Sequence, residues 1–90
     1  MPRNMRDREE EFRFEIAENI GVIGQSSSGW SKEINMVSWN GKQPKLDIRD
    51  WAENHERMSR GITLHTNEAL EMIKLLNNFF KDELAGAEPA

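Results

Sequence analysis

Tryptophans and basic side chains are the residues of this sequence whose types and spacing could do chemistry. Trp39 and Trp51 stand at the ends of two predicted strands, and Lys42, Lys45 and Arg49 lie between them. The bases of an unpaired nucleic acid stack on aromatic rings for about 1–3 kcal/mol each, while lysine and arginine neutralise its phosphates. The combination indicates a surface that binds single-stranded nucleic acid.

The same residues also have a purely structural interpretation. Tryptophan is usually at least partly buried, so Trp39 and Trp51 could instead close the ends of a sheet. Lys45 and Arg49 could be an ordinary solvated face. The residue pattern taken alone favours this structural interpretation.

Three further residues are candidates for the same surface. Trp30 and Lys32 open the second predicted strand after a serine-rich loop. There Trp30 could either close over a bound strand or pack on the edge of the sheet. Arg60 precedes Gly61 and, by pattern alone, fits a surface position beside a turn better than a binding site.

The sequence does not bring together groups suited to catalysis or metal binding. His55 and His65 lie ten residues apart, without a cysteine or a carboxylate at ligand spacing. Asp47 and Asp50 fall on opposite faces of one predicted strand, so they cannot act as an acid–base pair. No Gly-rich phosphate loop or nucleophile motif occurs. We therefore expect no enzyme activity, no metal, no cofactor and no small-molecule substrate.

Four strands and one helix are predicted to position these residues. Period-two alternation and turn residues place the strands at about 12–23, 30–39, 44–51 and 61–64. The first strand contains an irregularity near Asn19 or Gly21, and Asn40-Gly41 predicts a hairpin turn between the second and third strands. Residues between the third and fourth strands are predicted to form a loop.

The third strand has the clearest alternation. Leu46 and Ile48 point the same way and are predicted to face the core. The other face of the strand is predicted to be exposed and carries Lys45, Asp47, Arg49 and Trp51.

A C-terminal helix is predicted from about residue 67 to residue 83, with Thr66 as its N-cap. Its apolar arc covers roughly 220°, whereas packing on one sheet needs little more than 100°. The excess predicts a second partner, and a twin helix from another copy of the chain is the economical choice. The residues predicted to form this dimer interface are Leu70, Ile73, Leu76, Phe79 and Phe80.

Length and charge are compatible with one small domain. Of the 90 residues, 12–84 are predicted to form the folded domain, 1–11 a charged disordered arm and 85–90 a disordered tail. The net charge of −4 resides mainly in the C-terminal part, because residues 25–65 carry six basic and five acidic side chains. The overall charge therefore does not exclude a nucleic-acid partner.

The cellular location is inferred from what the sequence lacks. It contains no cysteine, which suits a reducing compartment. No apolar run reaches the roughly 20 residues of a membrane span, and the first residues do not resemble a signal peptide. We expect a cytoplasmic protein, with association with the nucleoid as an option in a bacterium, and no membrane partner.

Two linked motifs resemble a known family. The segments 45–51 (KLDIRDW) and 60–64 (RGITL), followed by a C-terminal helix, resemble the transcriptional positive-cofactor-four coactivators. The segments GWSKE, at 29–33, and VSWNG, at 37–41, resemble in particular the bacterial YdbC-like branch of that family. The resemblance extends from about residue 12 to residue 80.

The resemblance implies a fold and a function. The fold is α+β, a four-stranded curved antiparallel sheet followed by one C-terminal helix, and it is dimeric, with a groove for single-stranded DNA and no enzyme activity. Trp39 matches the family's base-stacking aromatic, Arg49 and Trp51 match the arginine of the third strand and the aromatic after it, and Arg60 matches the basic residue before the fourth-strand glycine. The full set expected to bind nucleic acid is Trp30, Lys32, Trp39, Lys42, Lys45, Arg49, Trp51 and Arg60.

The sequence also departs from the eukaryotic members of the family. It has a short charged arm in place of a long region rich in serine and lysine, and Met36 and Val37 stand where the second strand could carry a cation. We therefore expect weaker binding, and a coactivator role does not follow from the resemblance.

The functional hypothesis is a homodimer that binds single-stranded DNA largely independently of sequence, with RNA as a further candidate, in transcription regulation or DNA replication and repair. The alternative is a protein-interaction module whose exposed tryptophans bind a transcription factor or a polymerase subunit. Charge reversal at Lys45 and Arg49 separates the two hypotheses, because a peptide-binding surface would depend mainly on the tryptophans.

Overall fold

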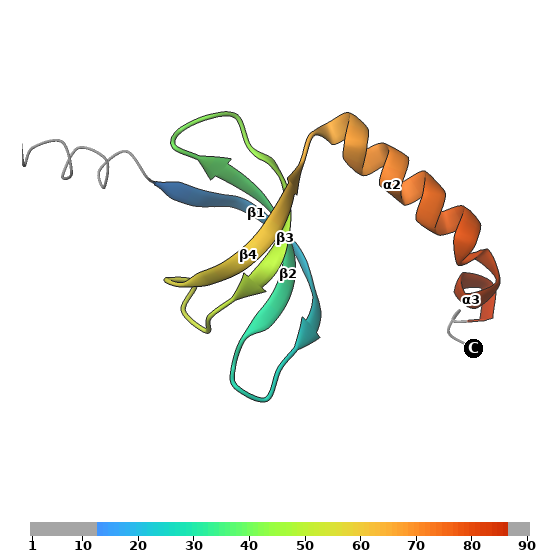
Figure 1. Ribbon diagram of the computed structural model, residues 1–90, viewed down its shortest axis with the longest axis horizontal. Helices are drawn as coiled ribbons and strands as arrows, with labels where there is room; N and C mark the ends of the chain where they lie inside the picture. The colour runs from blue at the N-terminus through green and yellow to red at the C-terminus, as the bar shows by residue number, and fades with distance from the viewer. Residues whose placement is uncertain (1–12, 87–90) are drawn as a thin grey trace, which may run out of the picture.

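In residues 13–86, a four-stranded antiparallel sheet is followed by two helices (Figure 1). The computed structural model describes residues 13–86, so the predicted N-terminal arm and the last four residues lie outside the described part. The sheet order is β1-β2-β3-β4. The elements are β1 (Phe14–Gln25), β2 (Ser31–Trp39), β3 (Lys45–Trp51), β4 (Met58–Leu64), α2 (Thr66–Phe79) and α3 (Lys81–Gly86). The predicted fold class, a four-stranded antiparallel sheet with a helical C-terminus, is confirmed.

The turns and irregularities of the sheet follow the local sequence. Asn40 and Gly41 have φ angles of 55° and 76°, the left-handed pair that a tight hairpin turn requires. The predicted irregularity in β1 is confirmed by a register shift between Asn19 and Gly21, one of three along this strand. β4 is longer than predicted and begins at Met58, because Met58 pairs with Trp51 of β3.

Strong curvature gives the sheet two different faces. Trp39 pairs with Phe14 of β1 and Trp51 pairs with Ser31 of β2, so the two tryptophans come from opposite ends of the sheet. The Phe14 ring nevertheless lies 6.1 Å from the Trp39 ring and 5.3 Å from the Trp51 ring. We call the side that carries these rings the inner face. Its other residues include Asn19, Glu33, Asn35, Val37, Asp47 and Arg49.

The opposite side, the outer face, is apolar. Direct strand pairing aligns two rows of side chains across β2, β3 and β4. The rows are Ile34, Ile48 and Ile62, and Met36, Leu46 and Leu64. Ile62 is 52% exposed and the other five are half-buried. Residues 13–86 therefore leave the outer face only partly covered.

The predicted burial of the third strand is wrong for two residues on its supposedly exposed face. Asp47 and Trp51 are completely buried, whereas Leu46 and Ile48 are only half-buried. The physical reason is that curvature closes the inner face over Asp47 and Trp51. On the other side, α2 begins next to the end of β4 and extends away from the sheet (Figure 1).

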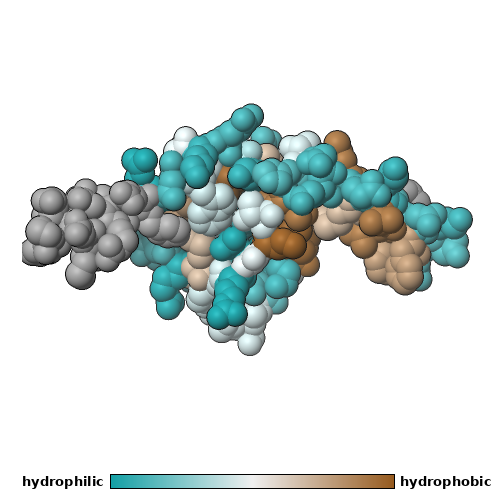
Figure 2. All heavy atoms as spheres, turned by 45° about the horizontal axis from the view of Figure 1, so that its top comes forward, coloured by the Kyte–Doolittle hydropathy of each residue, from teal (hydrophilic) through white to brown (hydrophobic). Residues whose placement is uncertain are grey.

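The helices extend away from the sheet. Ala69 is the only buried residue of α2, and no residue of α3 is buried. Figure 2 shows apolar surface gathered where the sheet meets the helix and again along the helix. All five residues predicted to form a dimer interface are exposed, together with Leu75 and Leu84.

The helix ends differ from the prediction by small amounts. The N-cap is His65 rather than Thr66, and the Glu68 carboxylate accepts a hydrogen bond of 2.8 Å from the His65 N–H. The single predicted helix is divided, because α2 ends at Phe79 and α3 begins at Lys81. The boundary predicted at residue 84 falls inside α3, which ends at Gly86.

Candidate nucleic-acid interface

Trp39, the last residue of β2, is the centre of the candidate site. It is half-buried, and the guanidinium carbon of Arg49 lies 4.8 Å from the centroid of its ring. The Phe14 ring approaches at 6.1 Å with its plane tilted by 46°. A cation over an indole ring is an attractive arrangement that fixes the orientation of both groups. The indole is thus held in place without being buried completely.

Arg49 itself is held by the protein. Its Nε and Nη2 donate to the two carboxylate oxygens of Asp47 at 2.6 and 2.7 Å, which is the bidentate geometry of a strong arginine–carboxylate pair. Its Nη1 donates to the carbonyl oxygen of Ser59 at 3.2 Å. The side chain is only 12% exposed. Arg49 therefore orients Trp39. Most of its side chain is buried and already paired, so it is less available for the phosphate contact that the sequence predicted.

Gly61 allows β4 to approach Arg49 closely. It pairs directly with Arg49, and a Cβ atom at position 61 would collide with the Arg49 Cβ and with the carbonyl oxygen of Ile48. Glycine is the residue that permits such an approach of two backbones. Close packing of β4 against β3 thus explains why position 61 of the Arg60-Gly61 motif is a glycine.

Cationic side chains flank the Trp39 end of the sheet. Lys45 is half-buried and lies opposite Val37 on the inner face, while Lys42 is exposed in the turn after β2. Arg13 joins them from the start of β1, because its N–H donates to the Asn40 side-chain oxygen at 2.6 Å and its carbonyl accepts from the Asn40 N–H at 2.7 Å. No sequence signal pointed to Arg13, because its neighbours depend on how β1 pairs with β2.

Trp51 is not part of the exposed surface. It is completely buried between the Phe14 ring at 5.3 Å and the His55 ring at 5.5 Å, so the expectation that it projects from an exposed face is wrong. In this conformation Trp51 cannot stack on a base. It supports Trp39 indirectly, since Phe14 contacts both tryptophans.

The remaining candidate residues lie elsewhere. Lys32 is on the outer face, where its Nζ pairs with the Asp50 carboxylate at 3.1 Å. Trp30 lies before the first residue of β2, at the other end of the strand from Trp39, and Arg57 lies over its ring at 5.5 Å. Arg60 is exposed on β4, the strand at the edge of the sheet. Of the eight predicted residues, the structure brings together Trp39, Lys42, Lys45 and Arg49.

A family model settles the relationship that the motifs suggested. The model of Transcriptional Coactivator p15 (PC4) matches residues 26–75, which is more than half of the chain. The chain belongs to this family. The PC4 match contains β2, β3, β4 and most of α2, and therefore contains Trp39, Lys42, Lys45 and Arg49.

A relative of this PC4-family chain covers more of it. A protein from Treponema pallidum (strain Nichols), which is named "Uncharacterized protein", is 36% identical over 83 residues. The alignment covers 87% of this chain and 98% of the relative. The similarity thus extends across nearly the whole of both chains.

A buried carboxylate tethers the loop between β3 and β4 to the inner face of the PC4 sheet. Glu33 is 3% exposed and accepts hydrogen bonds from Ser31 Oγ at 2.5 Å and Asn35 Nδ2 at 3.2 Å. His55 Nε2 lies 3.0 Å from both of its oxygens. Burial alone would raise the pKa of Glu33, but the hydrogen bonds from Ser31, His55 and Asn35 outweigh burial and lower it.

The lowered pKa of Glu33 predicts an acid-sensitive contribution to stability. A carboxylate whose pKa is lower in the folded than in the unfolded chain stabilises the fold above its ordinary pKa of 4.5, and this contribution disappears as the pH falls through the folded-state value. Glu33→Gln should therefore be less stable than the natural chain near neutral pH, with a difference that shrinks below about pH 4.5. Urea unfolding of both proteins at a series of pH values measures it. A difference that does not change with pH would contradict the prediction.

Within residues 13–86, no cluster of three or more histidine, cysteine, aspartate or glutamate side chains could hold a metal ion. In the same part of the chain, no helix has the length and apolar character that crossing a membrane requires.

Proposed function

We propose that this PC4-family protein is a homodimer that binds single-stranded DNA largely independently of sequence, without catalysis, in transcription regulation or in DNA replication and repair. The observation that carries the proposal is the Trp39 indole, held against the Arg49 guanidinium at 4.8 Å at one end of the sheet. A partly exposed ring that is already oriented can stack on a base at a small entropic cost.

Electrostatics supports the same surface despite the net charge of −4. Lys42, Lys45 and Arg13 flank Trp39 at the end of the sheet. On the inner face, the buried Asp47 forms an ion pair with Arg49, and the buried Glu33 contacts His55. The local positive charge beside Trp39 is therefore available to phosphates.

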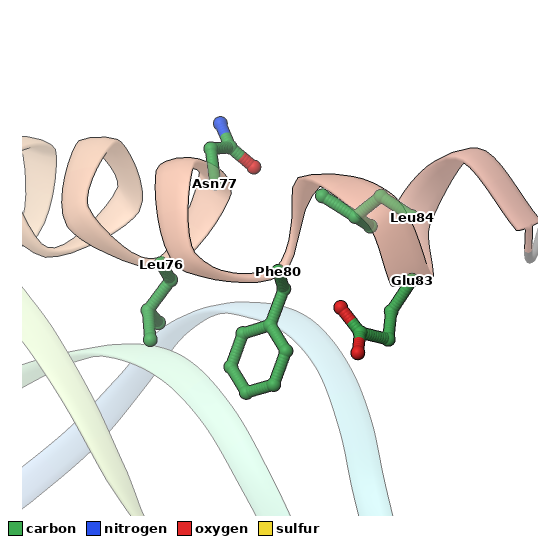
Figure 3. A pocket seen from close by; sticks show the side chains of 5 residues that line it. All are labelled: Leu76, Asn77, Phe80, Glu83 and Leu84. Carbon is green, nitrogen blue, oxygen red and sulfur yellow. The ribbon is translucent and has the colours of Figure 1, made fainter.

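Two apolar surfaces that residues 13–86 of one chain do not cover completely support the homodimer. The outer face of the sheet carries six apolar side chains, and α2 and α3 present a further set. Figure 3 shows the side chains of Leu76 and Phe80 projecting from the same side of the helix, where they line a pocket together with Asn77, Glu83 and Leu84. Large apolar patches on a small chain indicate a protein interface. A symmetric partner supplies a helix for each outer face.

Titration with a dye-labelled oligothymidine tests the DNA proposal. We expect binding that weakens steeply with salt, and a weaker signal for a matched duplex. Trp39→Ala should lower affinity about 5- to 150-fold, the equivalent of about 1–3 kcal/mol of stacking. Charge reversal of Lys42 and Lys45 should weaken binding and reduce the slope of log K against log salt by at least about 1.4, or about 0.7 for each phosphate that is no longer neutralised.

Lys32→Glu is the matched control, because Lys32 lies on the outer face and is paired with Asp50. It makes the same charge change as Lys45→Glu alone, away from Trp39, and should leave affinity nearly unchanged. Equal losses in the Lys32 and Lys45 variants would show that binding follows total charge and would overturn the proposed surface. A natural chain that does not bind oligothymidine even at low salt would overturn the DNA proposal and favour the protein-interaction alternative.

A further inference from the structure

A hollow lined by Trp30 lies at the end of β2 opposite to Trp39. It opens between the loop that joins β1 to β2 and the loop that joins β3 to β4, and its volume of about 480 Å³ is within the range of about 300–1,000 Å³ typical of ligand pockets. Seven residues line it: Ser28, Gly29, Trp30, Ala52, Glu53, Asn54 and Arg57.

Both walls of this hollow are formed by hydrogen-bonded loops. In the first loop, the Ser26 N–H donates to the Trp30 carbonyl at 2.8 Å, and Gly29 adopts a positive φ of 93°. In the second loop, the Ala52 N–H donates to the Arg57 carbonyl at 2.9 Å. His55, at the centre of that loop, is tethered to Glu33 of the inner face. The hollow is thus formed before any ligand arrives.

The chemistry of the lining fits a nucleobase. Trp30 is half-buried and lines the hollow, and the Arg57 guanidinium lies 5.5 Å from the centroid of its ring. That spacing leaves no room for a base between the two groups, so a base that enters the hollow stacks on the side of the indole or of the guanidinium that faces away from the other. The Glu53 carboxylate repels a phosphate but accepts hydrogen bonds from an amino group. Asn54 adds an amide group to the wall. These groups favour the base rather than the backbone as occupant.

We infer that the hollow lined by Trp30, Glu53 and Arg57 is a second site that takes one unstacked base of a bound strand and prefers a base with an exocyclic amino group. This inference rests on the proposed function and adds a base preference to it. The two unpaired bases differ at position 4, where cytosine presents an amino donor that a glutamate can accept and thymine presents an oxygen acceptor that a glutamate repels; the one donor of thymine on this edge is its N3–H. Glu53 therefore discriminates cytosine from thymine.

The test compares the affinities for labelled oligocytidine and oligothymidine of about 15 nucleotides, near the upper end of typical site sizes. The natural chain should bind oligocytidine about 5-fold more tightly. Glu53→Gln should bring the ratio of the two affinities close to one, and the ratio is insensitive to the general effect of removing a negative charge. Trp30→Ala should weaken binding of both strands by about 5-fold or more.

Trp39→Ala is the matched control, since it should weaken both oligonucleotides while keeping their ratio. Arg57→Ala provides a second variant of the hollow that leaves both tryptophans in place, and it should weaken binding as Trp30→Ala does. If Trp30→Ala and Glu53→Gln match the natural chain while Trp39→Ala binds more weakly, the second site is wrong and the proposed function stands. If the natural chain binds neither oligonucleotide, the proposed function fails and the second site fails with it.

Discussion

Replacing Asp47 with alanine is expected to lower the free energy of unfolding by about 3–5 kcal/mol, the usual effect of removing one partner of a buried ion pair. Asp47 is completely buried and accepts two hydrogen bonds from Arg49 and one, at 2.9 Å, from Thr63 Oγ1. Its loss leaves the Arg49 guanidinium without its bidentate carboxylate partner. Urea denaturation at one fixed protein concentration measures the change.

Asp50→Ala is the matched control for this experiment. Asp50 is three residues further along β3, on the outer face, where its side chain is 38% exposed and pairs with Lys32. An exposed pair of this kind contributes no more than about 1 kcal/mol. Similar losses in the two variants would contradict the buried pair as a main source of stability. Arg49 also orients Trp39, so the Asp47 variant should in addition bind oligothymidine more weakly.

Replacing both Leu76 and Phe80 with aspartate is expected to convert the proposed dimer into a monomer. Burying a leucine or phenylalanine side chain contributes about 1.5–3 kcal/mol, and each substitution acts twice in a symmetric dimer. We therefore expect the dimer Kd to rise by at least about a thousand-fold. Light scattering should then report the 10.5 kDa chain rather than twice that mass.

The control adds the same two charges to the polar side of the helix. Asn67→Asp and Asn78→Asp lie outside the apolar arc, and both residues are exposed. This variant should keep the mass of the natural protein. A natural chain that is already monomeric at micromolar concentration, or a control that dissociates as readily as the Leu76 and Phe80 variant, would overturn the proposed interface.

Local signals predicted most of the fold. The alternation in β3 and the Asn40-Gly41 turn depend on neighbours in sequence, and the structure confirms both the strand and the turn. The start of β4 was missed because Met58 joins the sheet through its pairing with Trp51, which is a tertiary effect. Strand boundaries set by pairing are not visible in composition.

The site was less accessible to sequence reasoning, because period two shows that a strand has two faces but not which of them is buried. The burial of Trp51 results from curvature and from its contact with Phe14, far away in sequence. For Lys32 a signal was present. It lies seven residues before Trp39 on the same strand, an odd separation that places the two side chains on opposite faces.

The guanidinium shared by two partners has a consequence for what position 49 can tolerate. Arg49 completes the charge balance of Asp47 and also rests on the Trp39 indole. A lysine would keep the positive charge. Its ammonium group is not planar, so it cannot donate to both carboxylate oxygens of Asp47 in bidentate geometry and stack on the Trp39 ring at the same time. The stability of the buried ion pair and the orientation of the Trp39 ring thus depend on one side chain. A substitution at position 49 changes both together.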